Sequence, residues 1–457
     1  MTGPEDTPGR EGRDRRQLGP FEAVRELAFD APFPRVVPVR QRVDAPTEAD
    51  PEGAALAALA PLRGSVRPGM TVAVTAGSRG IHDLVPVLRG AGRFLAGAGA
   101  LPFLVPAMGS HGSATAAGQV EVLAGLGVTE ASVGLPIRAS MDTVVVDRVP
   151  GGPDVHLDRH AAGADAILAV NRVKPHTDFH GPVESGLAKI VAIGLGKQRG
   201  AEAIHAYGSA SLGRLVPEVA ARVVATGKLI GGLAVVENAL ERTARVAFVE
   251  PGGIGGPAES ALLDEARRLM GRLPFSDLDV LVVDELGKDK SGSGLDTNVV
   301  GRMMIRGSED YPGPRIANIV VLDVSAASHG NAVGLGLADF VPFRVLEKLD
   351  LRAMYVNSMT SGIGGVQRGQ IPIALATDRD AVAAAMLCCG RPDPENVRLV
   401  RMADTLDTAH LVVSEALWPE VEGHPDLEVT GPPGPLEFDA GGALQGAPAP
   451  DRVAGTR

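Results

Sequence analysis

Short apolar runs alternate with stretches of helical periodicity through the middle of the chain, and glycine-rich turns separate them. Apolar runs of about 4–8 residues between such turns are typical of strands that are buried on both faces. We expect strands of this kind at 71–75, 101–107, 166–170 and 231–237, and helices at 82–98 and 114–126. The repeated order of strand, glycine-rich turn and helix predicts an α/β fold with mainly parallel sheets.

A second unit with the same pattern follows from residue 273. Its strands are expected at 279–286, 316–324 and 371–377, and its helices at 343–354 and 381–389. Both ends of the chain are rich in Gly, Pro and charged residues, a composition that favours disorder. We therefore predict a disordered N-terminal extension, an N-terminal α/β domain, a C-terminal α/β domain and a Gly/Pro-rich, loosely attached tail, over residues 1–33, 34–272, 273–415 and 416–457. The active site is expected in the cleft between the two domains.

Composition and charge narrow the function classes. The 457 residues are 45% hydrophobic and 22% charged, as in ordinary globular proteins, and the net charge of −11 argues against a general nucleic-acid binder. The sequence contains no run of about 20 apolar residues, which is the length that a membrane-spanning helix needs. We therefore expect a cytoplasmic protein. The cysteines are the adjacent Cys388 and Cys389, which argues against an iron–sulfur centre, a cysteine-based zinc site and a disulfide framework.

Histidines and basic side chains gather just after the predicted strands. Those that follow the strands at 71–75, 101–107 and 166–170 are Arg79, then His111, and then His176, His180, Lys189 and His205. In a parallel sheet the loops beyond the carboxyl ends of the strands converge on one crevice, where ligands bind. Imidazoles and amines crowded at such a place predict metal, phosphate or proton chemistry.

The segment that follows the third strand leaves two interpretations open. Its histidines, His176 and His180, have the spacing of two metal ligands on one helix, but Pro175 and Pro182 interrupt a continuous helix. One of the two is then a candidate acid or base, and the other orients the loop. The later stretch IGLGKQRG is either helical or a glycine-rich phosphate cradle. Lys189, in apolar surroundings, has the setting of a reactive amine.

Three stretches together resemble the nickel-pincer lactate racemase family: TAGSRGI at 75–81, PAMGSHGSAT at 106–115, and the segment from Lys174 to His205. In that family a pyridinium mononucleotide with two sulfur-containing groups is attached to a lysine through a thioamide and holds nickel. The resemblance implies that Lys189 is the tether and that His205 completes the nickel coordination. It further implies that Ser78 and Gly196 lie beside the cofactor.

The same resemblance assigns the proton chemistry and the substrate contact. It implies that His111 and His176 act as acid and base, and that Arg79 holds the substrate carboxylate. Histidine, with an unperturbed pKa of about 6.5, suits proton transfer in both directions near neutral pH. His180 is the alternative to His176, because the loop between the first histidine and the lysine is longer here than in the family.

Further departures from the family pattern concern the substrate. The acidic residue three positions before the arginine is replaced by Ala76. The family's Leu-Asp-x-Asn stretch is kept at 295–298, but the later Gln and Lys positions correspond to Gly301 and Met304. This pattern indicates a 2-hydroxy acid other than lactate, with Lys288 or Lys290 as compensating contacts; a solvated loop is the alternative for these two lysines.

The leading hypothesis is therefore an isomerase, a racemase or epimerase of a 2-hydroxy acid that works by reversible hydride transfer to the nickel cofactor. The implied partners are a small hydroxy acid, the cofactor-assembly proteins and a second copy of the chain in a homo-oligomer, with no nucleic acid and no membrane. The alternatives are a non-enzymatic binder of a phosphorylated small molecule, suggested by IGLGKQRG, and a metal-dependent lyase on the same scaffold.

Overall fold

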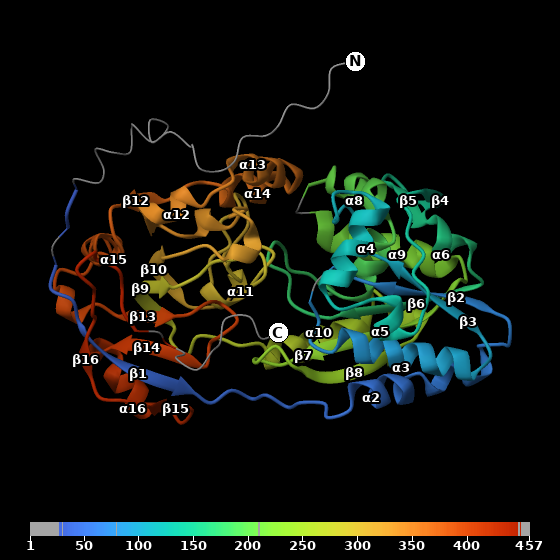
Figure 1. Cartoon of the computed structure of the whole chain (residues 1–457), viewed down its shortest axis with the longest axis horizontal. Coiled ribbons are helices and arrows are strands. Elements are labelled where there is room, and N and C mark those ends of the chain that lie inside the picture. The colour runs from blue at the N-terminus through green and yellow to red at the C-terminus, as the bar shows by residue number, and fades with distance from the viewer. Residues whose placement is uncertain (1–26, 30, 79, 209–210, 447, 449–457) are drawn as a thin grey trace, which may run out of the picture.

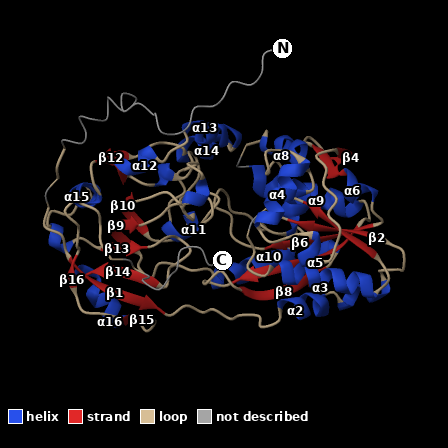
Figure 2. Ribbon diagram, in the orientation of Figure 1, coloured by secondary structure: helices blue, strands red, loops and turns tan. Residues whose placement is uncertain are grey.

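The computed structural model describes residues 27–29, 31–78, 80–208, 211–446 and 448. Two α/β domains lie beside each other, each built on its own sheet (Figure 1). The sheets are mainly parallel, as the alternation of apolar runs and helices predicts (Figure 2). Among the described helices, none has both the length and the apolar character needed to cross a membrane.

The first domain is organised around a sheet in which four neighbouring strands are parallel and the last is antiparallel. Its order is β3 (Leu101–Pro106), β2 (Thr71–Ala76), β6 (Ala166–Arg172), β7 (Leu229–Glu237) and β8 (Thr243–Val249). Strands β4 (Thr143–Arg148) and β5 (Asp154–Asp158) form a separate antiparallel pair. The expected strands at 71–75, 101–107, 166–170 and 231–237 are all present in this sheet.

Helices cover both faces of the first sheet, which explains why its strands are apolar throughout. Val72 and Val74 point into one core and Ala73 into the other, as the alternation of a strand requires. One core is closed by α2 (Pro51–Ala58), α3 (Leu84–Gly97), α4 (Ala116–Gly125) and α5 (Glu130–Val133). The other is closed by α6 (Arg159–Gly163), α7 (Leu187–Lys189), α8 (Lys197–His205), α9 (Leu212–Ala225) and α10 (Pro257–Leu269).

The second domain has a longer, mixed sheet. Its parallel part is β12 (Ile373–Leu375), β11 (Phe340–Pro342), β10 (Arg315–Val321), β9 (Asp277–Val283) and β13 (Leu399–Met402). Antiparallel strands extend it: β14 (His410–Ser414), β1 (Arg35–Gln41), β15 (Leu427–Val429) and β16 (Gly434–Pro435). The helices of this domain are α11 (Thr297–Val300), α12 (Phe343–Glu347), α13 (Leu351–Thr360), α14 (Gly362–Arg368), α15 (Asp378–Leu387) and α16 (Trp418–Gly423).

Both ends of the described chain differ from the sequence expectations. Strand β1 lies inside the range expected for the first domain, yet it pairs with β14 and β15 of the second sheet. The region expected to be a loose tail supplies β15 and β16, and Leu436 is buried in the second core. Near the other end the ring of Phe33 packs 4.9 Å from that of Phe438, centroid to centroid. Apolar burial and backbone pairing to β1 thus hold segments whose composition suggested disorder. Residues 1–26, which carry most of the expected extension, lie outside the described range.

The helix expected at 343–354 is instead two helices. Helix α12 ends at Glu347, and α13 begins at Leu351. Asp350 separates them, because its side chain accepts a hydrogen bond from the backbone N–H of Ala353 and caps the second helix. The break gives α13 a new direction, and this helix and α14 lie at the edge of the second domain that faces the first (Figure 1).

The segment from Leu187 to Leu195 should contribute strongly to the free energy of unfolding through its burial in the first core. Leu195 is fully buried, so Leu195→Ala should lower the free energy of unfolding by about 2–5 kcal/mol. Denaturant titration followed by circular dichroism measures this change. Leu101→Ala is the control, because Leu101 is 59% exposed and should shift the free energy by no more than about 0.5 kcal/mol. Equal effects of the two substitutions would contradict the assigned core.

Candidate functional site between the two domains

A cavity of about 2390 Å³ lies between the domains, and both contribute to its wall. From the first domain come the residues just beyond the carboxyl ends of β2, β3 and β6, which is where a parallel sheet places its ligand site. From the second domain come the loop 288–293 and parts of α13 and α14. Of the side chains predicted from the sequence, those that line this cavity are Ser78, His111, His176, Lys189, His205, Lys288 and Lys290.

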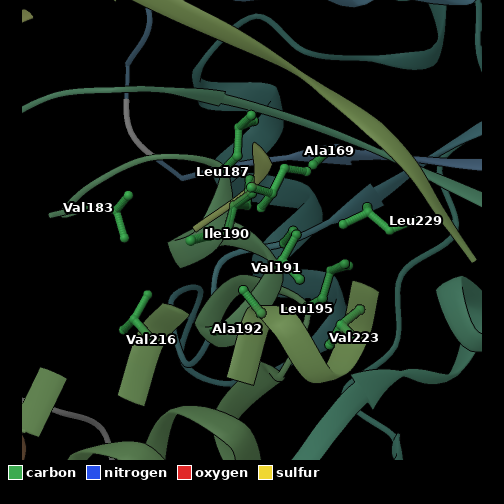
Figure 3. Close-up of a cluster of buried hydrophobic side chains, with 14 of the residues drawn as sticks. Ala169, Val183, Leu187, Ile190, Val191, Ala192, Leu195, Val216, Val223 and Leu229 are labelled. Carbon is green, nitrogen blue, oxygen red and sulfur yellow. The ribbon is translucent and has the colours of Figure 1, made fainter. Parts of the chain in front are cut away.

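Lys189 reaches the cavity because the helical segment around it is amphipathic. Leu187, Val191 and Leu195, four residues apart, are fully buried in the first core (Figure 3). Lys189 and Ile193 lie on the opposite side and line the cavity. Residues Ile190–Gly194 form a π-helical turn, labelled η5, between α7 and α8. Such turns are rare and occur often at functional sites.

The segment does not continue as one helix to His205. Lys197 has a left-handed backbone, with φ of 54°, and breaks the helical path at the start of α8. A Cβ at Gly196 would lie 2.6 Å from the carbonyl oxygen of Ala192, so only glycine fits there. Gly196, expected beside the cofactor, does not line the cavity; its place is a close packing contact. Beyond this break, Ala201 and His205 again face the cavity.

Lys197 is completely buried, which corrects the interpretation of IGLGKQRG as a phosphate cradle. Its ammonium group lies 3.3 Å from a carboxylate oxygen of Asp158 and donates to Gln119 Oε1 at 3.0 Å and to the carbonyl oxygen of Pro106. Burial lowers the pKa of Lys197, and Asp158 opposes that change. Because the amine is committed inside the protein, it does not contact a ligand in the cavity.

His111 lies in the turn after β3. The buried Lys197 supports this turn indirectly, through Gln119. Gln119, which accepts from Lys197, donates through its Nε2 to the carbonyl oxygens of Gly109 at 2.9 Å and His111 at 3.3 Å. The His111 ring is exposed to the cavity, and its Nδ1 forms a hydrogen bond with Ser78 Oγ. A hydroxyl both donates and accepts, so this partner is compatible with either tautomer of the ring.

His176 belongs to a loop, residues 174–185, which we call the histidine loop. Lys174 and Ser185 close it by antiparallel backbone hydrogen bonds. Inside the loop the buried carboxylate of Glu184 accepts from the backbone N–H groups of His176 at 2.6 Å and Gly181 at 3.2 Å. Arg267 also donates to it, at 2.6 Å. A buried carboxylate with several donors is well satisfied and holds the loop rigidly.

His180 points away from the cavity. Its Nδ1 is 2.9 Å from Glu184 Oε1, and its ring lies 3.8 Å from that of Tyr311, a residue of the second domain. It does not line the cavity wall. Of the two rival histidines, the structure therefore brings His176 to the cavity and uses His180 in packing the loop.

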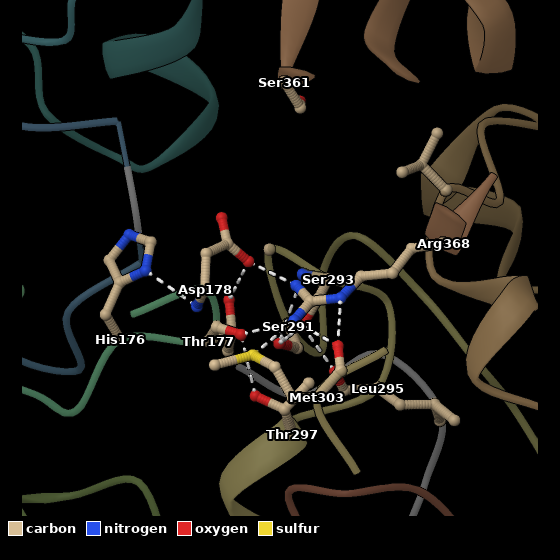
Figure 4. Close-up of polar contacts among 12 residues, drawn as sticks. His176, Thr177, Asp178, Ser291, Ser293, Leu295, Thr297, Met303, Ser361 and Arg368 are labelled. Carbon is tan, nitrogen blue, oxygen red and sulfur yellow. Dashed lines mark hydrogen bonds and ion pairs between the residues drawn. The ribbon is translucent and has the colours of Figure 1, made fainter. Parts of the chain in front are cut away.

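The two ring nitrogens of His176 have different partners. Nδ1 accepts a hydrogen bond from the backbone N–H of Asp178 at 3.0 Å (Figure 4). Nε2 lies 2.5 Å from Lys189 Nζ. The Asp178 N–H on Nδ1 favours a neutral ring with its proton on Nε2, whereas an ammonium at Lys189, which can only donate, favours the proton on Nδ1. His176 and the amine of Lys189 thus contact each other on the cavity wall.

Charges on and around His176 and Lys189 shift the pKa values of the neighbouring Asp178 and His205. Burial would raise the pKa of Asp178, but His176, protonated at acid pH, together with Arg368 and Lys189 outweighs it and holds the pKa at about 2. The surrounding protein and the positive charge of Lys189 lower the pKa of His205 below its ordinary 6.5, although Asp178 partly opposes them. His205 is an exposed residue, and its exposed part faces the cavity. A neutral imidazole is the form that binds metal ions.

The remaining predicted site residues are the three proposed substrate contacts, Arg79, Lys288 and Lys290. Arg79 lies outside the described residues, but its neighbours Ser78 and Gly80 line the cavity. Lys288 donates to the carbonyl oxygens of Gly292 at 2.8 Å and Val333 at 2.7 Å. Lys290 lies within 3.4 Å of three carboxylates, those of Glu285, Asp289 and Asp404. Burial would lower the pKa of Lys290, but these carboxylates raise it. Both lysines are thus already engaged by the protein.

Several residues of the site were missed in the sequence. Glu184, Asp178, Lys197 and Arg368 are charged side chains that hold the loops of the site, and no local pattern marks them. Arg368 lies in the glycine-rich stretch 361–369, whose role the sequence left undecided. Within the described part of the chain, no group of three or more His, Cys, Asp or Glu residues is arranged to hold a metal ion.

Comparison with known proteins gives distant structural likenesses. No family model matches the chain, and no curated protein matches it in sequence. A structural-genomics protein from Thermotoga maritima shares 14% identity with a TM-score of 0.47, over 70% of this chain and 84% of that chain. The lactate racemase apoprotein from Thermoanaerobacterium thermosaccharolyticum shares 14% identity with a TM-score of 0.38, over 65% of this chain and 71% of that chain. At these scores the function must be argued from the site.

The electrostatic link between Lys189 and His205 can be measured directly. Lys189→Met should raise the pKa of His205, because it removes a positive charge that disfavours the imidazolium. NMR titration of the His205 ring gives this pKa, with Lys228→Met as the control. Since the folded pKa lies below the unfolded one, acidification through the interval between them weakens the contribution of His205 to stability. An unchanged or lower pKa in Lys189→Met would contradict the arrangement.

Proposed function

We propose that this protein is a racemase or epimerase of a 2-hydroxy acid that uses a nickel-containing pyridinium mononucleotide tethered to Lys189. The observation that carries the proposal is the convergence of four side chains on one cavity wall. His111, His176, Lys189 and His205 come from separate loops and helices, and all of them line the cavity between the domains. An amine, a low-pKa imidazole and two further imidazoles are the set that this chemistry needs.

The donor set fits the cofactor that the sequence resemblance implies. Lys189 offers a primary amine for a covalent link, at the π-helical turn where it is held beside His176. His205 offers one imidazole, and its lowered pKa keeps the ring neutral and able to bind a metal near pH 7. A metal carried by an organic group needs only one such protein ligand. When bound, the cofactor would accept hydride from the substrate carbon and return it.

We assign to His111 the role of taking the hydroxyl proton of the substrate. Its Nδ1 forms a hydrogen bond with Ser78 Oγ, and the hydroxyl oxygen can accept this hydrogen bond from Nδ1–H. In this tautomer Nε2 carries the lone pair that we propose takes the proton of the substrate hydroxyl. A positioned general base of this kind contributes about 10²–10⁴-fold to a rate. Ser78 would serve to orient this ring, and we propose Arg79, next in the chain, as the contact for the substrate carboxylate.

His176 starts from the opposite state. With Nδ1 occupied by the Asp178 N–H, and with Lys189 no longer an ammonium once it is covalently linked, the neutral ring carries its proton on Nε2, on the cavity side. In this form it donates a hydrogen bond to a substrate oxygen on its side. To act as a proton acceptor the ring must move its proton to Nδ1, which requires release of the Asp178 N–H. The two histidines therefore supply complementary roles in one direction of the reaction.

The second domain would contact the remainder of the substrate. Gly301 and Met304, at the positions where the family has Gln and Lys, do not line the cavity. Instead Asn331, Arg352 and Asn357 are on that wall. We infer a 2-hydroxy acid with a polar substituent, held by these side chains and not by Lys288 or Lys290, whose amines are engaged elsewhere.

The tether can be tested by intact-mass measurement. Protein produced together with the cofactor-assembly proteins should carry an adduct and nickel, and Lys189→Ala should carry neither the adduct nor the metal. Lys228→Ala is the matched control, because Lys228 donates to the carbonyl oxygen of Ala164 and does not line the cavity. An adduct that persists in Lys189→Ala would disprove the assignment of the tether. Wild-type protein with no adduct under these conditions would disprove the proposed cofactor.

A further inference from the structure

One peptide group joins the second domain to the ring of His176. Its carbonyl, that of Thr177, accepts from Thr297 Oγ1 at 3.0 Å and from Arg368 Nη2 at 2.7 Å. Its N–H, that of Asp178, donates to His176 Nδ1 at 3.0 Å (Figure 4). Both donors to the carbonyl belong to the second domain, whereas the acceptor of the N–H belongs to the first.

Peptide geometry makes these contacts interdependent. A trans peptide group is planar, and its C=O and N–H point in opposite directions. Donors that fix the oxygen of Thr177 therefore also fix the direction in which the Asp178 N–H points. The second domain in this way aims a hydrogen-bond donor at His176 without touching the imidazole nitrogens.

Arg368 is a rigid source for this contact. Its side chain is only 3% exposed, at the end of α14. Nε and Nη2 donate to the carbonyl oxygen of Met303 at 3.0 Å and 2.8 Å, which anchors the guanidinium in its own domain. Its Nη1 pairs with the carboxylate of Asp178. A planar guanidinium with several fixed partners loses little freedom for each further bond, so it holds the peptide group firmly.

The preceding carbonyl is held by the same domain. The carbonyl oxygen of His176 accepts from Tyr311 OH at 2.8 Å and from Asn298 Nδ2 at 3.3 Å. Two successive carbonyls of the histidine loop thus each accept two bonds from the second domain.

We propose that Arg368 is a positioning residue that controls the proton state of His176. Through the carbonyl of Thr177 and the carboxylate of Asp178 it keeps the Asp178 N–H on Nδ1, which favours the tautomer with the proton on Nε2 against the opposite preference of the Lys189 ammonium. A relative movement of the domains that withdraws Arg368 frees Nδ1 and lets the ring change tautomer. The importance of this control for catalysis rests on the proposed function, but the control itself does not.

Nitrogen NMR of histidine-labelled apoprotein tests the proposal without the cofactor. The resonances of His176 are assigned by their loss in His176→Gln. In the wild type the shifts of Nδ1 and Nε2 give the ratio of the two tautomers, which the Asp178 N–H biases toward Nε2–H and the Lys189 ammonium toward Nδ1–H. In Arg368→Met the ratio of the two tautomers should change by about three- to tenfold toward the Nδ1-protonated form, the size expected for one lost hydrogen bond.

The matched control is Arg302→Met. Arg302 is also largely buried in the second domain, where it binds the carboxylate of Asp339 and the carbonyl oxygen of Leu337, but it does not contact the histidine loop. This variant should leave the His176 ratio unchanged. Asp178→Asn removes the ion pair while it keeps the backbone N–H, and it should shift the ratio in the same direction as Arg368→Met. It provides the test if the latter variant does not fold.

An unchanged tautomer ratio in folded Arg368→Met, or in Asp178→Asn, would overturn the proposal. So would an equal shift in Arg302→Met, since the effect would then reflect general loosening of the second domain. Failure of the proposed function has a different signature, because it would appear as missing adduct in the mass measurement while the nitrogen spectra of the apoprotein still report on Arg368.

Discussion

The site depends on one constraint: the segment from Leu187 to His205 must bury one side in the first core while the other side forms the cavity wall. Leu187, Val191 and Leu195 meet the first requirement, and they leave Lys189 on the cavity side. The π-helical turn and the left-handed Lys197 then redirect the chain so that His205 returns to the same wall. A straight helix would bring these two residues to different faces, because 16 positions at 100° per residue place them about 160° apart around its axis.

The histidine loop is the second part of the site, and it belongs to both domains. Glu184 fixes it from inside the first domain, and Arg368, Thr297 and Tyr311 fix it from the second. The proposed proton chemistry at His176 would for this reason depend on the relative position of the domains. The other histidine of the proposed pair, His111, is held by first-domain residues, by Ser78 and by the buried Gln119–Lys197 contact. The two sides of the site thus differ in how they respond to domain movement.

Much of the fold follows from local pattern. Strands buried on both faces, such as β2 and β6, are continuous apolar runs, and they were predicted within a few residues. Strands β1, β15 and β16 were not, because their stability comes from pairing between the two ends of the chain. The residues of the site likewise divide into those predicted from local sequence and those that depend on distant partners. Residues after strand ends were predicted to converge and do so, whereas Lys197 and Arg368 depend on partners about 40 to 190 positions away. Helical breaks such as the one at Gly196 arise from packing contacts that the sequence does not display.

In the proposed reaction, hydride movement in this cavity inverts the carbon that bears the hydroxyl group, and His111 and His176 handle the hydroxyl proton. A 2-hydroxy acid deuterated at C2, incubated with cofactor-loaded protein in ordinary water, tests this most directly. Chiral separation followed by mass analysis should show the inverted product with its deuterium retained, because the hydrogen leaves and returns without exchange with water. Inverted product in which the deuterium has been replaced by hydrogen, or a dehydrated product without inversion, would contradict the account.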